Sequence, residues 1–117
     1  MPRLKESATI INTSSIEAVQ PAPMLTYAAT KAAIVNFTKG LAKEMTPKGI
    51  RVNSVAPRPG WTPLIPSTMP PEQVSSFGMQ RPAQPVELAP AYVYLASQES
   101  SYVSAQTIGV TGGTPLF

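Results

Sequence analysis

Tyr27 and Lys31, in the stretch YAATK, are the residues whose types and spacing best suit chemistry. On an α-helix the side chains at positions i and i+4 share a face, so the phenol and the ammonium can reach one small volume. An ammonium beside a phenol favours the phenolate and lowers the pKa of a tyrosine from its usual value of about 10. The pair therefore suits a general acid/base that works near neutral pH. The alternative is a surface tyrosine and a surface lysine at this spacing by chance.

The composition of the 117 residues narrows the chemistry further. They include no cysteine, no histidine and no aspartate. This excludes disulfides, thiolate and imidazole metal sites, cysteine nucleophiles and Ser-His-Asp triads from these residues. Any reaction must use Tyr, Lys, Ser, Thr, Arg or Glu, and we expect no metal site.

The net charge of +3 is unevenly distributed along the chain. Residues 1–60 hold eight Lys or Arg against three Glu, and residues 61–117 hold one Arg against three Glu. The lysines of one helix are spaced apart, which favours a solvated helix face over a nucleic-acid patch. No apolar segment approaches the length of about 18 residues that spans a membrane, and MPRLKESA lacks the apolar run of a signal peptide. We predict a cytoplasmic protein without nucleic-acid or membrane partners.

The first half of the chain predicts a strand, a helix and a second strand. Ala8–Ser15 is rich in β-branched residues and ends in a polar tip, and Ile50–Ala56 alternates apolar and polar residues. Between them, a helical pattern from about Met24 to Met45 stops at Pro47 and Gly49. The predicted buried stripe of this helix is Ala29, Ala33, Phe37, Leu41 and Met45, extended by Ile34 and Thr38. Such a βαβ unit places its strands in parallel.

The second half predicts a proline-rich loop, a helix and a third strand. Six prolines lie between Pro57 and Pro71, and a short helical turn is expected at Glu72–Phe77. A helix opens at Gln84-Pro85, and Thr107–Thr111 is a strand closed by a Gly-Gly turn. The predicted buried stripe of this helix is Val86, Ala89, Val93 and Ala96. The order β-α-β-loop-α-β predicts one α/β domain over residues 1–117.

The order of the motifs resembles one known family. A Ser-Ser pair ends the first strand, Tyr-x-x-x-Lys opens the next helix, and IRVNSVAP follows it. With YAATKAAIVNFTKGLAKE, WTPLIPSTMP, LAPAYVYLAS and TIGVTGG, the chain resembles the short-chain dehydrogenase/reductase family, and within it the glucose-dehydrogenase-like bacterial oxidoreductases. The resemblance runs over nearly all of the chain.

The resemblance implies the C-terminal half of a Rossmann-type doubly wound parallel sheet, with about three strands and two to three helices. It implies hydride transfer between NAD or NADP and a carbonyl or alcohol carbon of a small molecule. By resemblance, Tyr27 is the acid/base, while Lys31 favours its phenolate form and binds the nicotinamide ribose. A serine of the pair donates a hydrogen bond to the substrate oxygen.

Either serine of the pair fits this role. Ser14 lies thirteen residues before Tyr27, which is the usual spacing in the family. Ser15 matches the strand-tip pattern instead, with one residue missing from the following loop. Strand register fixes side-chain direction whereas a loop tolerates deletion, so we favour Ser15. Asn12 is interpreted as an ordinary polar residue of the strand.

Two departures from the family pattern stand out. Aligning on Trp61-Thr62-Pro63 places Pro57 at the family's proline and Thr62 at the threonine that contacts the cofactor amide, but Arg58 at a glycine. Arginine has neither the small size nor the backbone freedom of glycine, which favours an obstructed cofactor site over a phosphate salt bridge. The family's glycine-rich turn, its catalytic asparagine and the neighbouring strand have no counterpart in this sequence.

Three hypotheses about function follow. The first is an oxidoreductase of this family, as a truncated or split chain that is inactive alone. The second is a non-catalytic module that forms homo-oligomers or pairs with a complementing full-length relative through the small-residue face Ala29, Ala32 and Ala33, unless that face covers the sheet. The third, a Ser-Lys hydrolase of Ser15 and Lys31, requires a neutral lysine and is the least favoured.

Overall fold

The computed structural model describes residues 7–18, 25–58, 84–113 and 116. Its elements follow the chain as β1 (Thr9–Thr13), η1 (Ile16–Ala18), α1 (Leu25–Met45), η2 (Thr46–Lys48), β2 (Arg51–Pro57), α4 (Pro85–Ala96), η3 (Gln98–Ser100) and β3 (Thr107–Val110). Among the described residues this order confirms the three predicted strands and the two long predicted helices, and the predicted proline-rich loop lies mostly outside those residues. The predicted turn at Glu72–Phe77 lies outside the described residues. Within the described part, none of the helices has the length and apolar character needed to cross a bilayer.

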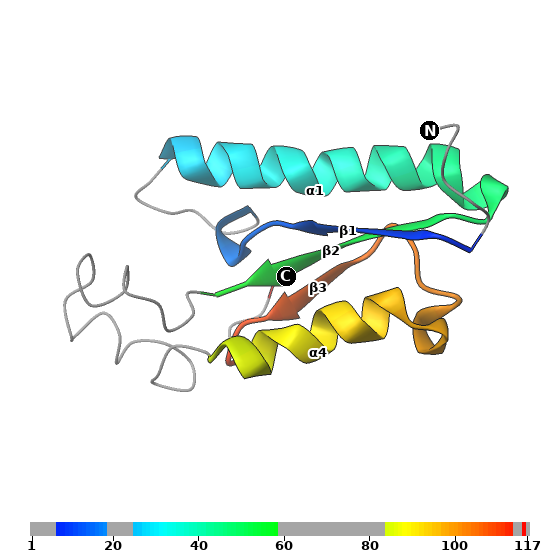
Figure 1. Ribbon diagram of the computed structural model, residues 1–117. Helices are drawn as coiled ribbons and strands as arrows, with labels where there is room; N and C mark the ends of the chain where they lie inside the picture. Colours follow the sequence, from blue (N-terminus) through cyan, green and yellow to red (C-terminus); the bar gives the residue numbers. More distant parts are fainter. Residues whose placement is uncertain (1–6, 19–24, 59–83, 114–115, 117) are drawn as a thin grey trace.

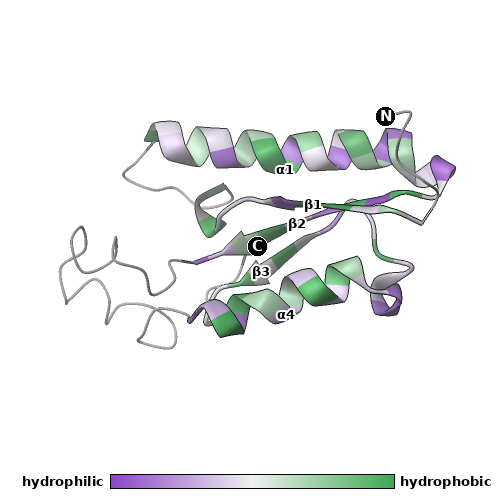
Figure 2. Ribbon diagram, viewed as in Figure 1, coloured by the Kyte–Doolittle hydropathy of each residue, from purple (hydrophilic) through white to green (hydrophobic). Residues whose placement is uncertain are grey.

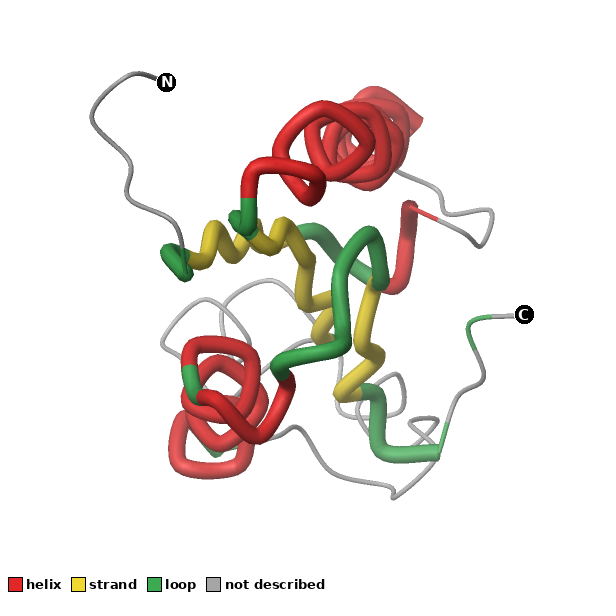
Figure 3. The backbone as a smooth tube through the Cα atoms, turned by 90° about the vertical axis from the view of Figure 1, so that its right-hand side faces the viewer, coloured by secondary structure: helices red, strands yellow, loops and turns green. Residues whose placement is uncertain are grey.

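The three strands form one parallel sheet in the order β1-β2-β3. Thr9 pairs with Arg51 at one end of the β1–β2 ladder, and Thr13 pairs with Val55 at the other. Figures 1 and 3 show α1 on one face of the sheet and α4 on the other. The carboxyl ends of parallel strands lie at one edge, so residues after β1 and β2 are brought to the same side of the molecule.

The helix α1 ends where the sequence predicts. Pro47 lies in the short 3₁₀ helix η2, and Gly49 follows with φ of 81°. That left-handed conformation suits glycine because it has no Cβ, and the Gly49 N–H donates to the Thr46 carbonyl at 2.9 Å. The chain then enters β2, whose residues Val52 to Ala56 are all buried. A strand covered on both faces reads as nearly continuous burial, as in other α/β folds.

The apolar core lies between the C-terminal half of α1 and the sheet. Its central cluster consists of Ala42, Met45, Ile50 and Val52, with Ala8, Ile10, Leu41 and Ala105 packed against it. These residues come from α1, both neighbouring strands and the segment before β3. The cluster therefore fixes the C-terminal end of α1 on the sheet by burial of apolar surface.

The predicted buried stripe of α1 is wrong at three of its positions. Ala29, Ala33 and Phe37 are exposed, whereas the buried residues of this helix are Val35, Thr38, Ala42 and Met45. The stripe that contacts the sheet lies on another side of the helix, because several apolar residues occupy each face and the pattern alone did not select one. The interpretation that the Ala29, Ala32 and Ala33 face covers the sheet is also wrong for Ala29 and Ala33.

The predicted buried stripe of α4 is likewise wrong. Val86, Ala89, Val93 and Ala96 are exposed in this chain, and the buried residue of the helix is Leu95. In Figure 2 most of α4 is green, which shows why the apolar pattern did not select the face on the sheet. The predicted start of the helix is confirmed, since Gln84 precedes it and its N–H donates to Glu87 Oε1 at 2.9 Å.

Two polar side chains of β2 hold the C-terminal segments in place. The guanidinium of Arg51 donates to the carbonyls of Leu95 (3.2 Å), Ser97 (3.1 Å) and Ser100 (2.9 Å), and to the Ser100 hydroxyl (2.8 Å). A positive charge at the C-terminal carbonyls of a helix is also favoured by the helix dipole. The buried amide of Asn53 joins two points of the segment before β3.

Candidate active site

The predicted site residues gather around the carboxyl end of β1 and the first half of α1. Ser14 and Ser15 follow β1 directly, as the predicted polar strand tip. Tyr27 and Lys31 lie in the first two turns of α1, one helical turn apart. The edge of a parallel sheet where the strands end is also where α/β proteins bind their ligands.

Ser14 fastens the end of β1 to α1. Its side chain is 2% exposed, and its hydroxyl donates to the backbone carbonyl of Lys31 at 2.8 Å. Its own N–H donates to the carbonyl of Val55 at 2.7 Å, which continues the pairing with β2 by one step. The hydroxyl proton of Ser14 is therefore engaged with the backbone of α1.

Ser15 occupies the next position, where the chain turns into η1. Ser15 is 8% exposed, and its carbonyl accepts a hydrogen bond from the N–H of Ala18 at 3.0 Å. The strand ends at Thr13, and Ser14 continues its pairing with β2 by one hydrogen bond, whereas Ser15 begins the turn into η1. The structure thus gives the two serines different surroundings, although they are adjacent in the sequence.

Tyr27 and Lys31 lie against each other, as their spacing predicts. The Nζ atom of Lys31 lies 5.4 Å from the centre of the Tyr27 ring. At this distance an ammonium is attracted to the face of an aromatic ring. Tyr27 is 42% exposed and Lys31 is half-buried, so the phenol is open to a small molecule. The pair offers a hydroxyl that can move a proton and a cation beside it.

Side chains of β1 alternate between the two helices, and Asn12 makes a contact with α1 that its interpretation as an ordinary strand residue did not include. Asn12 was interpreted as an ordinary strand residue, but its Nδ2 donates to Thr38 Oγ1 at 3.0 Å. The Thr38 hydroxyl in turn donates to the carbonyl of Ile34 at 2.8 Å. On the other face, the hydroxyls of Thr13 and Tyr92 are 2.8 Å apart. A polar strand residue two positions before the serine pair was the available signal.

Pro57 and Arg58 lie at the carboxyl end of β2. Pro57 is its last residue and pairs with Val110 of β3. The backbone N–H of Arg58 donates to the Val110 carbonyl at 3.0 Å, and Arg58 is half-buried. Both residues are therefore at the edge that carries Ser14 and Ser15. Thr62 lies outside the described residues.

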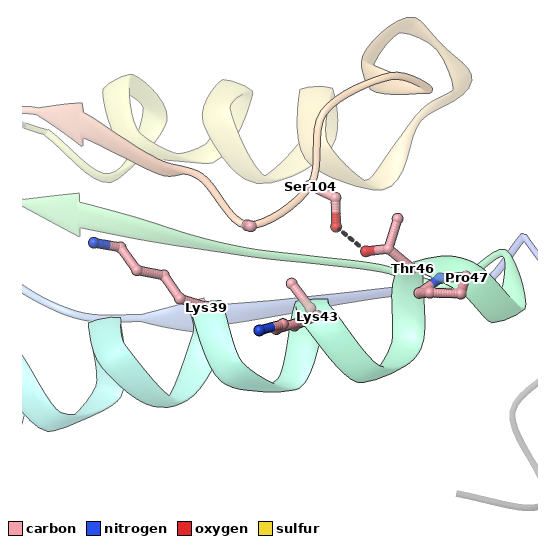
Figure 4. A pocket seen from close by; sticks show the side chains of 7 residues that line it. Lys39, Lys43, Thr46, Pro47 and Ser104 are labelled. Atoms are coloured by element: carbon pink, nitrogen blue, oxygen red, sulfur yellow. Dashed lines mark hydrogen bonds between the residues drawn. The ribbon is translucent and has the colours of Figure 1, made fainter.

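A shallow hollow of about 520 Å³ lies near the opposite end of α1 (Figure 4). It is lined by Lys39, Ala42, Lys43, Thr46, Pro47, Ser104 and Ala105. The hydroxyls of Thr46 and Ser104 are 2.7 Å apart beside it. Lys43 is twelve residues from Lys31, or about 18 Å along a helix, so this hollow is separate from the candidate active site. No group of three or more carboxylate, imidazole or thiol side chains that could hold a metal ion lies among the described residues.

Comparisons with known proteins match nearly the whole chain. Residues 1–115 match a family model described as enoyl-(acyl carrier protein) reductase. The chain is 57% identical to YghA, an uncharacterized oxidoreductase of Escherichia coli (strain K12), over 99% of this chain and 42% of that protein. It is 52% identical to the glucose and ribitol dehydrogenase of Daucus carota, over 97% of this chain and 40% of that protein.

A solved structure supports the same relationship. A 3-oxoacyl-[acyl-carrier protein] reductase from Brucella melitensis, with bound NAD, superposes with a TM-score of 0.79 at 45% identity. The match covers 90% of this chain and 40% of that one. The chain therefore spans about two fifths of the length of these relatives.

Proposed function

Because the chain belongs to the short-chain dehydrogenase/reductase family, we propose that its residues form the acid/base half of an NAD- or NADP-dependent oxidoreductase. The substrate is a small molecule with a carbonyl or hydroxyl carbon. The observation that carries the proposal is the Tyr27–Lys31 pair beside the serine tip of β1. As a domain, residues 1–117 are part of a single Rossmann-type unit.

The donors near the tip of β1 fit a nicotinamide cofactor. The Lys31 ammonium can donate hydrogen bonds to ribose hydroxyls, and the Tyr27 oxygen can accept one from them. Pro57, at the end of β2, and Thr62 are the further residues proposed to contact the cofactor. When bound, the nicotinamide supplies or takes the hydride. These residues do not distinguish NAD from NADP.

In reduction, Tyr27 gives its phenolic proton to the substrate oxygen; in oxidation, its phenolate takes the proton of the hydroxyl. The Lys31 ammonium, one helical turn away, supplies a positive charge that attracts the phenolate. The 5.4 Å between Lys31 Nζ and the Tyr27 ring centre supports this pairing. The third contribution is a serine hydroxyl that donates to the substrate oxygen and holds it in place.

We assign the substrate-binding serine as Ser15. Ser14 donates its only hydroxyl proton to the Lys31 carbonyl, and it is 2% exposed. A hydroxyl has one proton to donate, so Ser14 would have to break that bond to donate to a substrate. Ser15 lies one residue further from the strand, where the chain turns into η1, and this position at the strand tip supports the assignment.

We further propose that residues 1–117 alone do not transfer hydride. Hydride transfer requires the reacting atoms to lie about 3–3.5 Å apart, which needs a firmly bound cofactor. The relatives are more than twice as long as the matched segment, and β1 pairs only with β2 among the described strands. The remaining cofactor contacts must come from a complementing segment. Arg58, in place of a glycine, is proposed to narrow the cofactor site further.

A chimera tests the proposal. In it, residues 1–117 replace the matching 42% of the Escherichia coli relative. We expect it to oxidise or reduce the nicotinamide cofactor when it is given aldehydes, ketones, glucose or ribitol. The change in absorbance of the cofactor measures the rate. Tyr27→Phe should lower kcat by about a thousandfold, because general acid/base groups contribute about 10²–10⁴.

Tyr102→Phe is the matched control, because this substitution removes the same hydroxyl from a tyrosine that is fully exposed. It should leave kcat unchanged. An active chimera whose kcat is insensitive to Tyr27→Phe would contradict the proposed acid/base. A folded chimera without any nicotinamide-dependent turnover would contradict the proposed activity.

The second candidate function is an interaction module that forms oligomers or pairs with a complementing relative. The observation that favours it is the exposed apolar side of α1, where Leu25 is 77% and Phe37 is 61% exposed beside Ala29 and Ala33. Small residues allow close helix packing, and the large ones supply apolar area. Light scattering of the 117-residue chain with and without Phe37→Ser separates this function from a monomeric catalytic half.

A further inference from the structure

The hydrogen bond of Ser14 is more than the α-helix itself requires. In a regular α-helix, the Lys31 carbonyl already accepts the N–H of the residue four positions later. The Ser14 hydroxyl adds a second donor to that carbonyl at 2.8 Å, and does so from a side chain that is 2% exposed. Burying a hydroxyl costs free energy unless it is hydrogen-bonded, so the bond satisfies Ser14 and ties the strand to this point of the helix.

A second polar tie lies two strand residues earlier. Asn12 donates to Thr38, whose hydroxyl donates to the Ile34 carbonyl. Residues i and i+2 of a strand point to the same face, so Asn12 and Ser14 both face α1, while Thr13 between them contacts Tyr92 of α4. The two ties hold α1 at two separate points along its axis.

The two ties define the register of α1 on β1. Their helix positions, Thr38 and Lys31, are seven residues or about 10.5 Å apart along the axis. A slip by one residue moves the helix by about 1.5 Å and turns it by about 100°, which would break both ties. Apolar packing tolerates small displacements better than hydrogen bonds, because its attraction has no fixed direction.

We propose that Ser14 is a positioning residue for the Tyr27–Lys31 pair, a role that rests on the proposed function. By fixing the Lys31 backbone to the end of β1, it sets where the ammonium and, one turn earlier, the phenol stand relative to Ser15. It does not touch the reacting atoms. Asn12 and Thr38 support the same register from the next turns of the helix.

The first measurement is hydrogen exchange on the 117-residue chain. Ser14→Ala should raise amide exchange in residues 27–35 by about tenfold, because exchange reports the free energy of local opening. The matched control is Ser100→Ala, which also removes a buried serine hydroxyl bonded to helix carbonyls, those of Leu95 and Ser97. That variant should raise exchange around α4 and leave residues 27–35 unchanged.

The second measurement is the kinetics of the same variants in the chimera. Ser14→Ala should lower kcat about 10- to 100-fold with little change in KM, because a displacement of about 1 Å can cost about a hundredfold. Ser14→Thr, which keeps the hydroxyl, should restore most of the loss. Ser100→Ala should keep kcat within about twofold, because a substitution away from the candidate active site acts mainly on stability.

Each pattern of results decides the proposal. Unchanged exchange with a lost kcat would make Ser14 a group that touches the substrate, and raised exchange with an unchanged kcat would make it a structural tie; both overturn positioning. If the chimera is inactive, the proposed function fails, and exchange alone decides whether Ser14 holds this part of α1. If Ser14→Ala does not fold, Asn12→Ala takes its place, with the exchange rise expected at residues 34–38.

Discussion

The two ends of α1 are held to the sheet in different ways. At the C-terminal end, Ala42 and Met45 are buried in the apolar cluster with Ile50 and Val52. In the N-terminal half, Leu25 and Tyr27 are exposed, and the Ser14 hydroxyl after β1 donates to the Lys31 carbonyl; the bond from Asn12 to Thr38 lies further along the helix. The C-terminal end of α1 is thus held by apolar packing, and its N-terminal half is positioned by a hydrogen bond.

The two ends of α1 show what apolar burial and hydrogen bonds each contribute. Apolar burial contributes most of the stability and depends little on orientation. Hydrogen bonds contribute about 0.5–1.5 kcal/mol each, but they fix distance and direction. The proposed catalytic pair, Tyr27 and Lys31, therefore stands on the part of α1 that a hydrogen bond positions, and not on the part that apolar burial stabilises.

The largest effect on stability is expected at the packed end. Met45→Ala should lower the free energy of unfolding by about 2–5 kcal/mol, because it leaves a cavity where the side chain is 3% exposed. Denaturant unfolding of the chimera measures it. Leu25→Ala is the control at the other end of the same helix, and should change stability by less than about 0.5 kcal/mol. Equal losses of unfolding free energy in the two variants would show that the two ends of α1 contribute equally to stability, against this expectation.

An intermediate effect is expected from the polar contacts of Arg51. Arg51→Met should cost about 2 kcal/mol, because a charged donor is removed from the carbonyls at the end of α4. The loss should appear in denaturant unfolding and as faster hydrogen exchange in residues 95–101. Lys43→Met removes the same charge from an exposed position of α1, and it should be nearly neutral. A neutral Arg51→Met would show that packing alone holds α4.

The smallest effect on stability is expected on the exposed side of α1. Phe37→Ser should change the free energy of unfolding of a monomer by less than about 0.5 kcal/mol, since the ring is 61% exposed. Thermal or denaturant unfolding at low protein concentration measures this value. A loss that grows with protein concentration would instead show that this side is buried against another chain.

The elements and their order could be predicted from the sequence because local signals specify them. Pro47 and Gly49 end α1, Gln84 and Pro85 start α4, and the alternation of Ile50–Ala56 predicts β2. The proximity of Tyr27 and Lys31 followed from helix geometry alone. These features depend on residues close together in the chain.

The buried faces could not be predicted, because they depend on contacts between distant segments. In α4, apolar residues occupy more than one side, and only packing against the sheet selects Leu95 over Val86 and Val93. The same holds for Val35 and Ala42 against Ala33 and Phe37 in α1. The tie from Asn12 to Thr38 also joins residues 26 positions apart, which no local pattern reveals.

The central claim is that the N-terminal half of α1 serves catalysis and its C-terminal end serves stability. The most direct test measures kcat and the melting temperature of the chimera for Tyr27→Phe and Met45→Ala. We expect Tyr27→Phe to lose about a thousandfold in kcat at an unchanged melting temperature. Met45→Ala should melt several degrees lower and keep its kcat when assayed well below the transition. A Tyr27→Phe variant that retains its activity, or a Met45→Ala variant that loses activity without losing stability, would contradict the account.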